Sequence, residues 1–88
     1  MKTIIRDKTF AKHYLKRISP NQQIVKQFEA RVKRFLQAER SKTIGDHPLT
    51  KNKTGQRAFS ITGDIRVVYT ETDDAYIFQD IGSHNQVY

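Results

Sequence analysis

The chain has 88 residues, no cysteine and a formal net charge of +7. Its length fits a single small domain, residues 1–88, with a modest core that no disulfide reinforces. No apolar run approaches the roughly 20 residues needed to cross a bilayer, and the first residues lack the apolar stretch of a signal peptide. These properties exclude a disulfide-rich secreted domain and a membrane-spanning protein, and we expect a soluble, cytoplasmic one.

The positive charge is concentrated in the first half of the chain. Residues 1–42 contain twelve Lys and Arg against three Asp and Glu, whereas residues 43–88 contain four against six. A basic half beside a nearly neutral half indicates a surface that binds polyphosphate, with the reactive residues outside that surface. A solvated helical face with surplus lysine is the simpler alternative.

The N-terminal segment has the pattern of a strand followed by a helix. Residues 3–6 are short, β-branched and suited to a strand. Asp7 can cap a helix whose apolar residues Phe10, Tyr14 and Ile18 recur at helical spacing.

A second helix is predicted to begin at Ser19 and Pro20, because Ser is a good N-cap and Pro suits the first helical position. This helix has the strongest periodic signal in the chain, and we expect it to end between residues 41 and 45. Its apolar stripe comprises Ile24, Val25, Phe28, Val32, Phe35 and Leu36.

After Gly45 the period changes from helical to alternating. Residues 57–62, 65–71 and 75–81 predict three strands that form an antiparallel meander, with turns rich in Thr, Gly and Asp. The face that packs on the helices is expected to carry Phe59, Ile61, Ile65, Val67 and Tyr69. Together the elements predict an α+β fold, with two N-terminal helices packed on a small antiparallel sheet.

Two histidines and a carboxylate stand out in the second half. Strand directions place the turn at Asp64 and the end of the last strand, followed by His84, at the same end of the sheet. His47 starts at the opposite end, but the residues up to Gly55 can extend roughly 25 Å, at ~3.3 Å each, and bring it back. Because histidine accepts or donates a proton near neutral pH, two histidines can share the proton transfers of RNA cleavage.

Four motifs occur in order along the chain: His47-Pro48-Leu49, Gly55-x-Arg57, Ser60-Ile61-x-Gly63-Asp64-x-Arg66-Val67-x-Tyr69 and Gly82-Ser83-His84-x-x-x-Tyr88. Over the whole chain this order resembles the RelE superfamily of bacterial toxins, and within it the YafQ branch. The resemblance implies a β-α-α-β-β-β, microbial-RNase-like fold. It also implies a type II toxin, an endoribonuclease that cleaves messenger RNA on the ribosome and is neutralised by a cognate antitoxin. We expect the free toxin to be a monomer.

By this resemblance the catalytic residues are His47, Asp64 and His84, and Tyr88 stands where better-known members have a phenylalanine. We expect His47 to take the 2′-OH proton or to act as an orienting donor, and His84 to protonate the departing 5′-oxygen. Asp64 would hold an imidazole in one tautomer, and Tyr88 would stack a splayed base. This chemistry requires neither a metal nor a cofactor.

The chain departs from those members at three positions. Ser60 replaces a second strand histidine, Ile65 a tryptophan and Asp80 an arginine, so stabilisation of the phosphate would fall to Arg57 or Arg66. The basic helices are expected to bind RNA and the ribosome through Lys12, Lys16, Lys26, Arg31, Lys33 and Arg34.

Several candidates have simpler explanations. Asp64 suits a hairpin turn, Arg57 and Arg66 suit exposed ion pairs, and Tyr88 suits the cover of a sheet edge. We interpret His13, in the first helix, as a structural or surface residue. Two other functions stay open: a non-catalytic module that binds RNA or the ribosome, and a ParE-like gyrase poison, an activity with no evident need of the two histidines.

Overall fold

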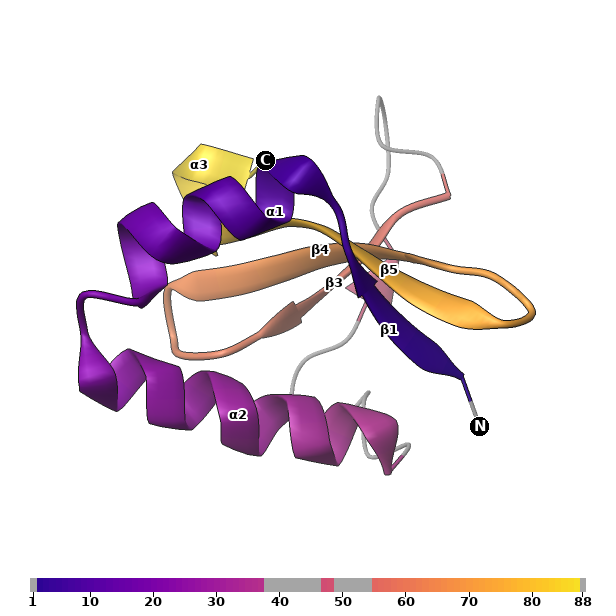
Figure 1. Ribbon diagram of the computed structural model, residues 1–88, viewed down its shortest axis with the longest axis horizontal. Helices are drawn as coiled ribbons and strands as arrows, with labels where there is room; N and C mark the ends of the chain where they lie inside the picture. The colour runs from indigo at the N-terminus through magenta and orange to yellow at the C-terminus, as the bar shows by residue number, and fades with distance from the viewer. Residues whose placement is uncertain (1, 38–46, 49–54, 88) are drawn as a thin grey trace.

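The computed structural model describes residues 2–37, 47–48 and 55–87 (Figure 1). In chain order its elements are β1 (Thr3–Arg6), α1 (Lys8–His13), the π-helical segment η1 (Tyr14–Ile18), α2 (Gln22–Leu36), β2 (His47–Pro48), β3 (Arg57–Ser60), β4 (Ile65–Glu71), β5 (Ala75–Ser83) and α3 (His84–Val87). The strands form one sheet in the order β1-β5-β4-β3-β2. The predicted α+β class and the order of strand, two helices and meander are confirmed.

The sheet is mixed, and the expectation of a purely antiparallel sheet was wrong in this respect. β2, β3, β4 and β5 pair antiparallel, as the meander predicts, but β1 pairs parallel with β5. A parallel neighbour needs a long connection, and the two helices and three strands between β1 and β5 provide one. The first strand therefore lies beside the last at one edge of the sheet.

The first helix begins where the sequence predicts. The Asp7 carboxylate accepts a hydrogen bond from the Phe10 backbone N–H at 2.9 Å, which satisfies one of the donors left free at a helix N-terminus. α1 continues directly into η1, where the backbone N–H of Ser19 donates to the Tyr14 carbonyl at 2.9 Å. This bond spans five residues and marks the wider π-helical turn.

The second helix begins later than predicted, and the assignment of Ser19 as its N-cap was wrong. Asn21 is the cap, because its side chain accepts hydrogen bonds from the backbone N–H groups of Gln23 and Ile24 at 3.0 and 3.3 Å. The N–H of Ser19 is still bonded within η1, so Ser19 and Pro20 belong to the end of the first helix and the turn after it. Asn and Ser are nearly equally favoured as N-caps, so residue preference alone does not show which of Ser19 and Asn21 caps the helix.

The main core lies between the sheet and the helices. It comprises Phe10, Ile18, Phe28, Phe35, Phe59, Ile61, Val67, Tyr69, Phe78 and Ile81, with Ile65 packed at its margin. The helix-facing side of the meander is therefore the predicted one. Phe35 stacks on Phe59 with ring centroids 4.7 Å apart and meets Tyr69 edge-on at 4.8 Å. The next residue, Leu36, is 44% exposed, so its place in the predicted apolar stripe was wrong.

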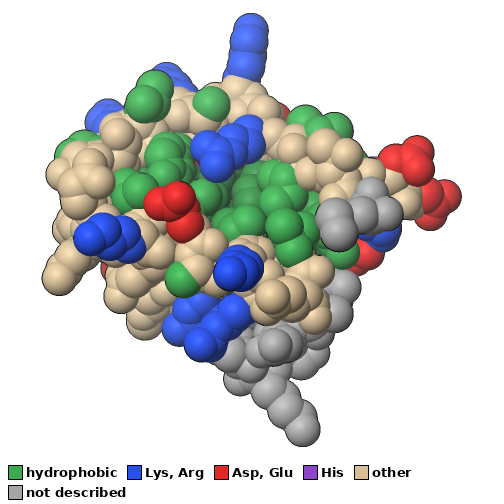
Figure 2. Space-filling view, turned by 60° about the horizontal axis from the view of Figure 1, so that its bottom comes forward, with side chains coloured by type: hydrophobic (Ala, Val, Ile, Leu, Met, Phe, Trp, Pro, Cys, Tyr) green, Lys and Arg blue, Asp and Glu red, His purple; other side chains and the backbone are tan. Residues whose placement is uncertain are grey.

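Apolar side chains also reach the surface on one side of the molecule. Figure 2 turns the α2 side toward the viewer and shows an apolar patch with Lys and Arg side chains beside it. The Arg6 guanidinium lies 5.2 to 5.6 Å from the ring centroids of Phe10, Tyr14 and Phe28. The cation covers the rings through cation–π contacts and seals that margin of the core.

The opposite face of the sheet is covered by α3, which was not predicted. Ala58, Val68 and Val87 form a second, smaller cluster there. Because successive residues of a strand point to opposite faces, Ala58 lies across the sheet from Phe59. The sequence predicted that the last strand ends at residue 81. Instead, Gly82 and Ser83 complete β5, Gly82 is buried, and α3 begins at His84.

Candidate active site

Asp64 and His84 leave the same end of one strand pair. Ile65 of β4 pairs with Ser83 of β5, Asp64 immediately precedes Ile65, and His84 immediately follows Ser83. Both residues are exposed. The strand directions predicted this adjacency, and the register shows it.

The turn before β4 does not use the Asp64 carboxylate. The Thr62 hydroxyl accepts hydrogen bonds from the backbone N–H groups of Asp64 and Ile65 at 3.2 and 3.0 Å. In the described part of the chain the Asp64 side chain has no hydrogen-bond partner. Thr62 therefore provides the side-chain hydrogen bonds of this turn. The Asp64 carboxylate takes no part in them, and Asp64 lies at the end of the sheet where His84 follows β5.

His47 lies farther from this end of the sheet than the sequence argument expected. It belongs to β2, where its backbone pairs with Ala58, and Ala58 in turn pairs with Val68. The backbones of His47 and His84 are separated by three strand spacings of about 4.8 Å across the sheet and by about four residues along it, roughly 15–20 Å in all. The loop that was expected to carry His47 back includes residues 49–54, which lie outside the described residues.

The two candidate arginines lie on opposite faces of the sheet. Arg57 pairs with Tyr69, and its Nε donates to the Tyr69 hydroxyl at 3.3 Å, on the face that carries the main core. Arg66 pairs with Ser60 on one side and with Gly82 on the other, and its Nη1 donates to the Ser60 hydroxyl. Only Arg66 shares the face of Gly82, which stands two residues before His84. The structure therefore separates the two residues that the sequence grouped for phosphate stabilisation.

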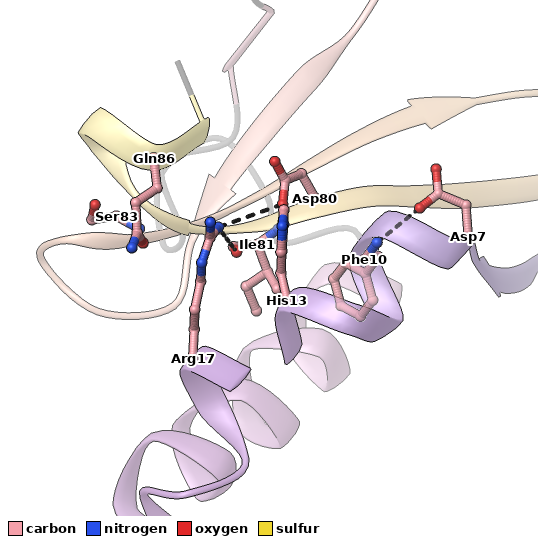
Figure 3. A network of polar contacts seen from close by, with 8 residues as sticks. All are labelled: Asp7, Phe10, His13, Arg17, Asp80, Ile81, Ser83 and Gln86. Atoms are coloured by element: carbon pink, nitrogen blue, oxygen red, sulfur yellow. Dashed lines mark hydrogen bonds and ion pairs between the residues drawn. The ribbon is translucent and has the colours of Figure 1, made fainter. Parts of the chain in front are cut away.

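A polar network joins the first helix to the last strand (Figure 3). His13 Nδ1 lies 2.5 Å from Asp80 Oδ1, and the Arg17 guanidinium lies 3.7 Å from the same oxygen. Arg17 also donates to the Ile81 carbonyl at 2.9 Å. β1 ends opposite Phe78, so this stretch of β5 lacks a strand neighbour on that side, and α1 and η1 supply its partners.

Sequence reasoning assigned no role in the site to Arg17 and treated His13 as structural or surface. The contact with Asp80 shows that His13 does hold the helix against the strand. A local signal was present, because His13 and Arg17 are four residues apart, the spacing that places side chains on one face of a helix. Their partner lies more than sixty residues away, and no local pattern indicates it.

Gly82 makes room for side chains from two elements. A Cβ atom at this position would lie 2.6 Å from Arg17 Nη1 and 2.7 Å from Gln86 Oε1. The Gln86 Oε1 in turn accepts a hydrogen bond from the Ser83 backbone N–H at 2.7 Å, which holds α3 against β5. Figure 3 shows Arg17 and Gln86 approaching the strand from different helices. Polar and cationic groups therefore meet beside the start of α3, where His84 lies.

The candidate RNA-binding cations fall into two groups. Lys12 and Lys16 are exposed on α1 and η1, beside β5. Lys26, Lys33 and Arg34 are exposed on α2, and Arg31 of that helix is half-buried. α2 packs on the Phe59 face of the sheet, so its cations lie across the sheet from Arg66 and α3. Tyr88, the expected stacking residue, lies outside the described residues.

No metal cluster and no membrane helix is found in the described part of the chain. Among residues 2–37, 47–48 and 55–87, no three or more His, Cys, Asp and Glu side chains gather closely enough to hold a metal ion. No helix in the same residues combines the length and apolar character needed to cross a membrane.

A mixed sheet that shares its main core with both N-terminal helices and carries a short C-terminal helix on its other face defines a RelE-like toxin fold. The chain belongs to the YafQ family: the family model described as "Bacterial toxin of type II toxin-antitoxin system, YafQ" matches residues 2–88. Both the superfamily and the branch indicated by the sequence are therefore confirmed.

Solved structures agree with this assignment. A metal-bound toxin from Helicobacter pylori is 26% identical with a TM-score of 0.80, and the match covers 100% of each chain. The E. coli DinJ-YafQ complex is 18% identical with a TM-score of 0.75, over 100% of this chain and 99% of that one. The YoeB dimer from Staphylococcus aureus is 21% identical with a TM-score of 0.77, over 94% and 97%. A comparison with curated protein sequences gave no match.

Proposed function

We propose that this toxin is a ribosome-dependent endoribonuclease that cleaves messenger RNA by acid–base catalysis without a metal. The observation that carries the proposal is the adjacency of Asp64 and His84 at the end of the β4–β5 pair. The turn does not use the Asp64 carboxylate, and His84 directly follows Ser83, which pairs with the residue after Asp64. Membership of a toxin family supports the same reading.

The reaction assigns a task to each group. A base removes the proton from a ribose 2′-OH, the 2′-oxygen attacks the adjacent phosphorus, and the bond to the 5′-oxygen breaks with a proton supplied by an acid. His84 is the acid, Asp64 orients its imidazole, and His47 is the base or an orienting donor. Arg66, on the face of Gly82, stabilises the negative charge that grows on the phosphate. Arg57 lies on the other face of the sheet and takes no part in this step of the proposed reaction.

The proposed setting is the ribosome in the cytoplasm. Exposed cations on both helices suit ribosomal RNA, because Lys and Arg release counterions when they contact phosphates. A cognate antitoxin is the expected inhibitor, since the E. coli YafQ has been solved in complex with DinJ. An acidic or amphipathic antitoxin segment would match the net charge of +7 and the apolar patch. We propose a monomer as the free state.

One observation favours a second candidate, a module that binds RNA or the ribosome without cutting it. The backbones of His47 and His84 are three strand spacings apart, with β3 and β4 between them, which is a long distance for two residues that act on one phosphate. In that reading the fold and the basic helices are kept while efficient chemistry is lost.

Induction of the chain in bacterial cells, with mapping of mRNA 5′ ends, separates the candidates. We expect growth arrest and new 5′ ends inside translated messages, and neither effect with His84→Ala. Growth arrest with intact messages and unchanged DNA would favour the binding module. DNA breaks with intact messages would favour a gyrase poison and overturn the proposed activity.

A further inference from the structure

The guanidinium of Arg17 lies over the end of β5, close to the proposed acid. Its Nη1 would be 2.6 Å from a Cβ at Gly82, and it donates to the Ile81 carbonyl at 2.9 Å. Gly82 stands two residues before His84, and Ser83, between them, is the last residue of the strand. A cation from the first helix therefore reaches the strand that leads to His84.

A second cation stands on the same face of the sheet. Gly82 pairs directly with Arg66, and directly paired residues share one face. The Arg66 guanidinium reaches Ser60 on β3, while Arg17 lies over Gly82 on β5. A phosphate bound on this face would be attracted by both positive charges.

Arg17 is also held in place before any ligand binds. Asp80 Oδ1 lies 3.7 Å from Nη1, and His13 Nδ1 contacts the same oxygen at 2.5 Å. The Arg17 side chain is 22% exposed, and in the described part of the chain its Nε and Nη2 make no hydrogen bond. A fixed guanidinium with unused donors is suited to bind a phosphate oxygen at a small entropic cost.

We propose that Arg17 is a catalytic residue of this toxin, which contacts a non-bridging oxygen of the scissile phosphate opposite Arg66. His13 and Asp80 are positioning residues that hold its guanidinium. The inference deepens the proposed function and rests on it. The simpler role for Arg17 is to fasten η1 to β5 through the Ile81 carbonyl, and the experiment below distinguishes the two.

Single-turnover cleavage of a defined message on saturating ribosomes provides the test. We expect Arg17→Ala to lower the rate roughly 10²- to 10³-fold, as loss of one transition-state donor does, with ribosome affinity within about threefold of the wild type. Arg17→Lys should recover only part of the rate, because an ammonium supplies charge without the planar fork. Lys8→Ala is the control: it removes an exposed cation from α1, and its rate should match the wild type.

A second variant moves the guanidinium without removing it. Gly82→Ala places a methyl group 2.6 Å from Arg17 Nη1, 2.7 Å from Gln86 Oε1 and 3.1 Å from Gln86 Cβ. The first two atoms are ends of flexible side chains, and α3 has to give by a few tenths of an ångström, so the fold should persist. We expect a comparable loss of rate, and the double variant Arg17→Ala/Gly82→Ala should be little slower than either single one. Circular dichroism and thermal melts establish that each variant is folded.

The outcomes are distinct. If the wild type cleaves and Arg17→Ala cleaves within about threefold of Lys8→Ala, the inference is overturned and the proposed function stands. Losses that multiply in the double variant would also overturn it, because Gly82→Ala would then act by another route. If the wild type binds ribosomes and leaves the message intact, the proposed function falls and this inference falls with it.

Discussion

His13 and Asp80 lie 67 positions apart in the chain, yet His13 Nδ1 is 2.5 Å from Asp80 Oδ1. The contact joins the first helix to the part of β5 that extends beyond β1. Both side chains are about one-quarter exposed, so the interaction is partly shielded from water. It fixes the carboxylate that lies beside Arg17, and so connects the packing of the helix with the proposed phosphate site.

The first prediction is that this contact stabilises the fold by a measurable coupling. His13→Ala and Asp80→Asn should each lower the free energy of unfolding, and a double-mutant cycle should give a coupling of about 1 kcal/mol, typical of a partly buried hydrogen bond. Urea unfolding measures it. Lys12→Ala, at the exposed neighbouring position, is the control and should change stability by less than ~0.5 kcal/mol. A coupling near zero would show that the contact is dispensable.

Local patterns were sufficient to predict much of the fold. β4 spans Ile65–Glu71, as the alternation predicts, and β3 and β5 begin at the predicted residues. The core face of the meander was also predicted, because a period of two assigns each residue to one face. Between Val68 and Tyr69 of β4 the pairing with β5 skips one residue, from Asp80 to Phe78, and so Phe78 and Ile81 both reach the core although they are three residues apart.

Features that depend on distant residues could not be predicted. The parallel pairing of β1 with β5 joins segments some seventy residues apart, and β-branched residues suit either direction. The strand register places Arg57 and Arg66 on opposite faces of the sheet. Both were candidates for phosphate stabilisation because both are arginines. Arg17 reaches the end of β5 because Gly82 leaves space for it, which is a packing relationship with no sequence period.

The second prediction concerns the start of α2. Asn21→Ala should destabilise the protein by about 1 kcal/mol, because two backbone N–H groups lose their acceptor. Ser19→Ala is the matched control: its side chain caps nothing in the described structure, so the loss should be much smaller. Thermal or urea unfolding measures both. A greater loss for Ser19→Ala would restore the boundary that the sequence suggested.

The third prediction tests the core at the end of α2. Phe35→Ala should cost about 3–5 kcal/mol, since the ring is fully buried against Phe59 and Tyr69. For so small a domain this loss is a large part of the total stability. Leu36→Ala, one position later and 44% exposed, is the control and should cost less than about 1 kcal/mol. Equal losses would mean that the helix is rotated about its axis relative to the sheet.

The fourth prediction concerns binding by the helices. Replacing Lys26, Lys33 and Arg34 with Gln should flatten the slope of log K against log salt for ribosome binding by roughly 2 to 3, at ~0.7 to 0.9 per phosphate contact. These residues lie across the sheet from Arg66 and α3, so the single-turnover cleavage rate at saturation should persist. An unchanged slope would show that α2 faces away from the ribosomal RNA.

The last prediction tests His84 as the general acid. His84→Ala should leave ribosome affinity and thermal stability nearly unchanged, because the residue is exposed at the start of α3, while single-turnover cleavage falls by roughly 10² to 10⁴. Replacing the 5′-oxygen of the leaving group with sulfur removes most of the need for a proton. Recovery of the His84→Ala rate on that substrate is the expected result. Equal impairment on both substrates would reassign His84 to positioning, and loss of folding would make its role structural. Asn85→Ala, the exposed next residue, controls for disturbance of the short helix and should cleave both substrates at the wild-type rate.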